Sequence, residues 1–230
     1  MDDKEKKGVS SKFILPDLAI LDPLLTTNLP ANITASTGID AMVHAIEAFT
    51  SINSNNNPVS KMLSIEALKL LGSSIKTAVF DGHNINARSN MLLGSMLAGK
   101  AFANSPVAAV HALAYPIGGL FNISHGLSNS LVLTSVMKFN SKNEETKKNY
   151  AYLSPYVFKN LDNSKNDEFL CNNFIDGLER LCKELNLPYR LRDLEIPEEA
   201  CKLMASEAMK QTRLLAVSYT HLRAHETARH

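Results

Sequence analysis

Asp40 and His44 are the first residues of this chain whose types and spacing could do chemistry. Because they are four positions apart, their side chains would lie one turn apart on the same face of a helix. A carboxylate and an imidazole placed in this way can bind one divalent cation. The alternative interpretation is a solvated polar stripe, extended by Glu47, on the surface of a helix.

His111 lies among apolar residues in the segment PVAAVHALAY, so its imidazole is expected to be buried. A buried polar group without a partner costs about 1–3 kcal/mol, so the ring needs a metal ion or a backbone carbonyl. Tyr115 lies one helical turn further on and would face the same way as His111. It would either pack as an aromatic core residue or bring its hydroxyl to the same site. His125 precedes Gly126, which would let the backbone approach a neighbour closely or would simply form a turn.

Asp40, His44, His111 and His125 together form a set of one carboxylate and three imidazoles. These donors suit Fe(II) or Zn(II), whereas calcium and magnesium sites need more oxygen ligands. The lack of cysteine in the set argues against a structural zinc. His83 lies in the polar turn DGHN and is expected at the surface. A cation with four protein ligands and one open position would polarise an alcohol or carbonyl oxygen.

Helices must position these side chains, because the apolar pattern from Thr34 onward is helical. We expect Ser36 or Thr37 to cap the first helix and Pro58 to begin the second. Asn84 or Asn86 is expected to cap a third, and later helices are expected over residues 107–114, 125–139, 142–152, 167–185 and 198–215, with a polar loop at 160–167. The sequence therefore predicts an all-α fold, preceded by one short strand in the apolar run 18–21.

Composition excludes several classes of protein. The 230 residues carry 24 Lys+Arg and 23 Asp+Glu, which is not the charge pattern of a nucleic-acid-binding protein. The charged start lacks the apolar core of a signal peptide, and polar residues and prolines interrupt the most apolar stretch, 101–121, so no membrane span is expected. Three cysteines without a CxxC pair indicate a reducing, cytoplasmic location.

Residues 217–230, VSYTHLRAHETARH, differ from the rest of the chain and have no apolar period of their own. The string resembles the conceptual translation of a sequencing adapter, so it is not expected to form part of the fold. The alternative is a native polar tail. Three of the seven histidines lie in this tail, at positions 221, 225 and 230.

Several longer segments carry a family resemblance, including TASTGIDAMVHAIEAF (34–49), GHNINARSNMLLGSMLAGKAFANS (82–105) and VHALAYPIGGLFNISHGLSNSLVL (110–133). On these segments the chain resembles the iron-containing (group III) alcohol dehydrogenases, from about residue 9 to about residue 215. The resemblance implies that Asp40, His44, His111 and His125 bind the metal, which polarises the oxygen of a small alcohol or aldehyde while hydride passes to or from NAD(P). Tyr115 stands where many members have a histidine credited with proton relay or substrate contact.

The resemblance also implies a nucleotide-binding α/β domain ahead of the helical one, and a homodimer or larger assembly. Residues 1–14 contain one glycine and no strand–turn–helix pattern, so they cannot supply that domain. We therefore expect a chain truncated at both ends, with a remnant of the α/β domain (1–30), the helical metal-binding domain (31–216) and a non-native tail (217–230). Such a fragment is expected to be inactive alone. The alternatives are a hydroxyacid–oxoacid transhydrogenase of the same fold and a non-catalytic helical metal-binding module.

Overall fold

The computed structural model describes residues 11–14, 16–158 and 166–215, and the predicted loop at 160–167 and the 217–230 tail fall almost entirely outside them. The described residues are all-α, as predicted. The helices are α1 (Ala31–Thr50), α2 (Pro58–Phe80), α3 (Ile85–Asn104), α4 (Ala109–Phe121), α5 (His125–Asn140), α6 (Glu144–Val157), α7 (Asp167–Glu184), α8 (Ala200–Met209) and α9 (Thr212–Leu215). Short 3-10 helices cover Lys12–Ile14, Pro23–Thr26 and Leu191–Leu194.

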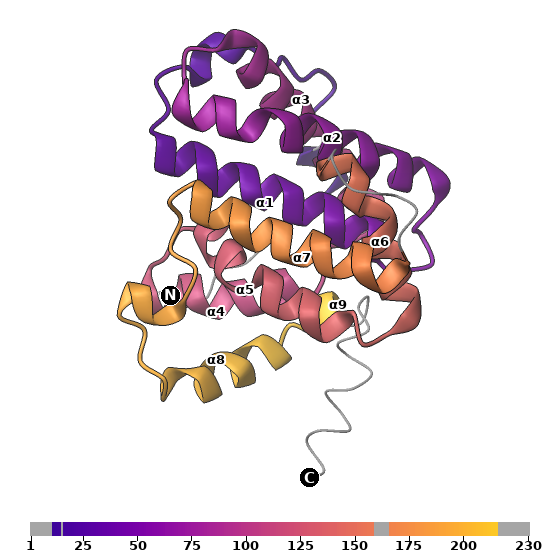
Figure 1. The fold of residues 1–230 in the computed structure, drawn as a ribbon, viewed down its shortest axis with the longest axis vertical. Coiled ribbons are helices and arrows are strands. Elements are labelled where there is room, and N and C mark those ends of the chain that lie inside the picture. The colour runs from indigo at the N-terminus through magenta and orange to yellow at the C-terminus, as the bar shows by residue number, and fades with distance from the viewer. Residues whose placement is uncertain (1–10, 15, 159–165, 216–230) are drawn as a thin grey trace.

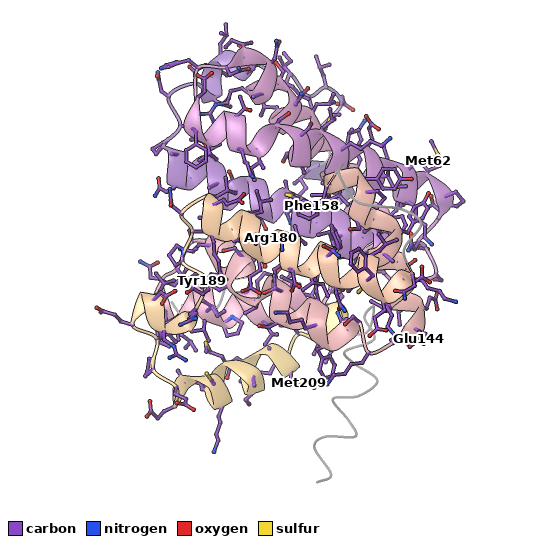
Figure 2. The ribbon with its side chains drawn as sticks, viewed as in Figure 1. Met62, Glu144, Phe158, Arg180, Tyr189 and Met209 are labelled. Atoms are coloured by element: carbon purple, nitrogen blue, oxygen red, sulfur yellow. The ribbon has the colours of Figure 1, made fainter. Side chains whose placement is uncertain are left out.

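Helix α1 is the central element of the fold (Figure 1). It packs against α2 and α3 on one side and against α5 on the other, while α4 pairs with α5 and with α8. Helices α6 and α7 form a further pair. Phe158, labelled in Figure 2, directly follows α6. Its ring centroid lies 6.2 Å from that of Phe174 on α7. Because neighbours cover α1 on several sides, a polar side chain on its buried faces must find a partner inside the protein. No described helix is both long and apolar enough to cross a membrane.

The first residues correct two of our expectations. The apolar run 18–21 forms no strand in the structure, and Leu18 and Ile20 are 77% and 82% exposed. A strand needs a neighbour for its backbone hydrogen bonds, and the described residues offer none. Helix α1 also begins earlier than predicted, at Ala31. The hydroxyls of Ser36 and Thr37 donate to the carbonyl oxygen of Ile33 inside the helix, so they do not mark its start.

Other boundaries follow the local chemistry of the sequence. Asn57 caps α2, which begins at Pro58, and Asn84 caps α3. Helix α4 runs beyond the predicted end at residue 114, because Pro116 is accommodated within it. It ends at Phe121, and the next residue, Asn122, adopts the left-handed conformation. The helix expected over 198–215 is divided into α8 and α9. The predicted start of α5 at His125 is confirmed.

Gly126 lies at a close approach between the backbones of α5 and α1. A Cβ atom added at Gly126 would overlap the carbonyl group of Ser36 and lie 3.2 Å from the backbone nitrogen of Thr37. The glycine is therefore required by a close backbone approach, which was one of the two interpretations of the sequence. The contact also fixes the preceding residue, His125, relative to α1.

We expect Gly126→Ala to destabilise the protein by about 1–3 kcal/mol, because backbone atoms cannot move aside as a flexible side chain can. Gly99→Ala on α3 is the matched control, since an added Cβ there meets no atom within 4 Å. Alanine has the higher helix propensity, so the control is expected to be neutral or stabilising by up to about 1 kcal/mol. Urea unfolding of both variants measures the difference, and equal effects would contradict the close approach.

Candidate metal centre

The four side chains selected from the sequence meet at one point between three helices. Asp40 and His44 come from α1, His111 from the first turn of α4, and His125 from the first residue of α5. Each offers one ligand atom, and these four atoms all lie within 4.8 Å of one another. The Oδ1 atom of Asp40 is 3.9 Å from Nε2 of His44 and 3.8 Å from Nε2 of both other histidines. The structure therefore brings together the complete predicted ligand set.

His44 is held between two rings. Its centroid lies 4.7 Å from that of His111, in a stacked arrangement, and 4.8 Å from that of Phe102. Burial lowers the pKa of His44 to about 4, the charge of Asp40 opposes this shift, and His111 adds to it. The imidazole is therefore neutral near pH 7 and keeps the lone pair that a metal ligand needs.

The exposed fraction of the four side chains increases from one side of the centre to the other. The side chain of His111 is 2% exposed, those of Asp40 and His44 are 16% and 21% exposed, and that of His125 is 38% exposed. The centre is thus most accessible beside His125. Tyr115 is half-buried on this side, with its ring centroid 6.0 Å from that of His125. Burial raises the pKa of Tyr115, which keeps its phenol protonated at neutral pH.

His83 is exposed in the turn between α2 and α3, as expected, and does not belong to the cluster.

Glu47 is a site residue that the sequence indicated only within the alternative interpretation, as part of a solvated stripe. It is only 5% exposed, and its carboxylate lies against the start of α4. Oε2 accepts a hydrogen bond from the backbone of Ala108 at 2.8 Å and lies 2.7 Å from Nδ1 of His111, while Oε1 accepts from the backbone of Val110 at 2.7 Å. The sequence did contain a signal for the burial of Glu47, namely the near-continuous apolar character of residues 39–49. A helix with this pattern is buried on most sides and leaves no solvated face for a charged side chain.

The Glu47 contacts have two consequences. Helix α4 has no capping side chain of its own, so the carboxylate from α1 satisfies backbone groups at its N-terminus, where the helix dipole favours an anion. With Nδ1–H of His111 directed at Glu47, the lone pair of Nε2 faces the other three ligand atoms. A carboxylate on the second nitrogen of a histidine is the usual support of a metal ligand.

Asn129 is a second residue that the sequence analysis missed. It is fully buried on α5, and its amide nitrogen lies 2.5 Å from Oδ1 of Asp40. The same nitrogen is 3.3 Å from Nε2 of His111 and of His125. Its position one turn after His125 was the signal in the sequence, because such a side chain faces the same way.

The donor set fits a divalent transition metal. One carboxylate oxygen and three imidazole nitrogens are ligands that Zn(II) and Fe(II) accept, at bond lengths of about 2.0–2.2 Å. The four atoms already converge, and Glu47 supports one of them from behind. The fold and the site together define a helical domain with a candidate transition-metal centre.

Comparison with known proteins identifies the family. The sequence profile of the Fe-containing alcohol dehydrogenase family, C-terminal, matches residues 34–226, and the chain belongs to this family of oxidoreductases. The matched range ends within the 217–230 tail.

Three relatives illustrate the similarity. Long-chain-alcohol dehydrogenase 1 of Geobacillus thermodenitrificans is 40% identical over 218 residues, which cover 93% of this chain and 53% of that protein. The crystal structure of a 1,3-propanediol oxidoreductase has a TM-score of 0.80 at 32% identity and covers 86% of this chain and 50% of its own. Sulfoacetaldehyde reductase from Bifidobacterium kashiwanohense, solved in complex with NAD+, has a TM-score of 0.77 at 26% identity over 91% of this chain and 52% of its own. The chain thus spans about half the length of these relatives.

We expect Glu47→Gln to weaken Zn(II) binding by about 10–100-fold, the usual effect of removing the support of a metal ligand. The carboxylate of Glu47 accepts hydrogen bonds from the start of α4 and from His111. A glutamine side chain would place its own NH2 donor against one of these donors, so the start of α4 and the orientation of His111 would both change. Isothermal titration with Zn(II) measures the effect. Glu66→Gln on α2, where the carboxylate is exposed and pairs only with Lys69 among the described residues, is the control and is expected to bind Zn(II) unchanged. Equal affinities for the two variants would contradict the role of Glu47.

Proposed function

We propose that this chain is the helical, metal-binding part of an oxidoreductase that interconverts small alcohols and aldehydes with NAD(P)(H). The observation that carries the proposal is the convergence of Asp40, His44, His111 and His125 in a member of the Fe-containing alcohol dehydrogenase family. The names of the relatives, which include alcohol dehydrogenases, support the reaction class. The family implies a metal and a nicotinamide cofactor.

A divalent cation at this centre, Fe(II) or else Zn(II), supplies a Lewis acid that polarises the oxygen of an alcohol or carbonyl substrate. Asp40 and the three histidines would hold the ion, and the carboxylate offsets part of its charge. Glu47 keeps Nε2 of His111 directed at the centre. Tyr115, protonated and beside the most exposed ligand, holds a proton at its hydroxyl oxygen where a substrate oxygen would enter. We therefore assign Tyr115 to proton relay or substrate contact.

The domain assignment follows from the same proposal. We infer that residues 31–216 form the helical metal-binding domain, that residues 1–30 connect it to a nucleotide-binding α/β domain, and that residues 217–230 are not native, although the family profile extends to residue 226. The start of α1 at Ala31 supports the first boundary. In this arrangement the groups that bind NAD(P) lie largely outside residues 31–216. We further propose that the enzyme is cytoplasmic and assembles as a homodimer or a larger oligomer.

Substitution of individual histidines tests the metal centre. We expect His111→Ala and His125→Ala to reduce bound metal far more than His83→Ala, because only the first two remove a converging nitrogen. Metal content is measured by mass spectrometry after reconstitution with Fe(II) or Zn(II) and removal of excess ion. A variant that lacks residues 217–230 measures the metal bound without any contribution from the histidines of the tail. Equal metal content in the three substituted variants would contradict the ligand assignment.

Activity measurements test the division between domains. We expect the purified 230-residue chain, loaded with metal, to show no NAD-dependent oxidation of ethanol or propanol, because the groups proposed to bind nicotinamide lie elsewhere. The full-length relative from Geobacillus thermodenitrificans, assayed in the same way with a long-chain alcohol, is the positive control. Appearance of NADH with the 230-residue chain alone would contradict the proposal.

A further inference from the structure

Asn129 touches ligand side chains from three different helices. It lies on α5, one turn after His125, and its amide also faces Asp40 on α1 and His111 on α4. The residue is fully buried, so solvent does not compete for these contacts.

The polar contacts of Asn129 are confined to the metal centre. Among the described residues, its Nδ2 atom donates to Oδ1 of Asp40 and otherwise lies near only Nε2 of His111 and of His125, each at 3.3 Å, and its carbonyl oxygen Oδ1 is buried without a hydrogen-bond partner. A buried asparagine that merely joined two helices would be expected to satisfy both ends of its amide. A leucine of similar size would fill the same space without leaving an unpaired oxygen, so helix packing does not account for an amide here.

Asp40 is the ligand that depends most on this amide. Its Oδ1 atom lies closer to Nδ2 of Asn129 (2.5 Å) than to any of the three imidazole nitrogens (3.8–3.9 Å). An amide NH2 group donates to a carboxylate, and no other described residue donates a hydrogen bond to Asp40. Without this donor, rotation about the Cβ–Cγ bond could carry the Oδ1 atom away from the imidazoles.

We propose that Asn129 is a positioning residue of the metal centre, whose amide holds Oδ1 of Asp40 where this oxygen and three imidazole nitrogens can bind one cation. The inference rests on the proposed metal centre and assigns to it a residue that does not itself bind the ion. Hydrogen-bonded partners of this kind orient ligating carboxylates as they do ligating histidines.

The experiment measures Co(II) binding by the 230-residue chain and its Asn129→Leu variant, which keeps the side-chain size but removes the donor. We expect the dissociation constant to rise by about 10–100-fold. The visible absorption of bound Co(II), which reports ligand number and geometry, is expected to change in position and intensity. A packing role alone would alter thermal unfolding without altering this spectrum.

Two controls accompany the measurement. Asn90→Leu on α3 removes a half-buried asparagine whose amide donates to Ser74, and it is expected to leave Co(II) affinity and spectrum unchanged. The double variant His111→Ala/His125→Ala measures the amount of Co(II) that the tail histidines bind. This amount is subtracted from the Co(II) bound by the other variants. If circular dichroism shows that Asn129→Leu does not fold, Asn129→Ala takes its place with the same expectations.

The outcomes separate this proposal from the proposed function. Co(II) binding by a folded Asn129 variant with unchanged affinity and spectrum would overturn the role of Asn129 and leave the metal centre intact. If the unsubstituted chain binds no more Co(II) than the double histidine variant, the metal centre itself is overturned, and the role of Asn129 with it.

Discussion

The buried carboxylate of Glu47 is the constraint on which the site depends. A carboxylate removed from water is costly unless hydrogen-bond donors replace the water, and within the described part of the chain all the donors come from residues 108–111. The start of α4 therefore cannot shift relative to α1 without leaving a charge unpaired inside the protein. His111 takes its orientation from this contact, and the other ligands meet it where α1 and α5 come together at Gly126.

The sequence revealed the groups that could bind a metal but not those that hold them. Asp40 and His44 have a spacing that a helix places on one face, and His111 is conspicuous among apolar neighbours. Glu47 was missed as a site residue because its partners are mainly backbone N–H groups more than 60 positions away, and no pattern of side chains identifies such donors. The contacts of Asn129 likewise exist only once three helices have packed, although its spacing from His125 was visible.

Helix boundaries were predictable where local chemistry decides them and unpredictable where tertiary structure does. Asn57 caps α2 and Asn84 caps α3 with their own side chains. The start of α2 at Pro58 was foreseen, and Asn84 was one of the two caps expected for α3. The apolar run 18–21 has the composition of a strand, but strand formation depends on neighbours rather than composition. Ser36 is a residue type that often caps helices, yet it lies inside α1. Its hydroxyl donates to a carbonyl oxygen of the preceding turn instead of accepting from a backbone N–H at the helix start.

The wide separation of the four proposed ligands along the sequence would link metal supply to the amount of folded protein. In the unfolded chain Asp40 and His44 are neighbours, whereas His111 and His125 are distant from them, so a cation gains all four donors only from the assembled helices. An ion that binds the native state in preference to the unfolded state stabilises it by mass action. Shortage of the ion would then lower the abundance of the protein through degradation of unfolded chains, in addition to any loss of turnover.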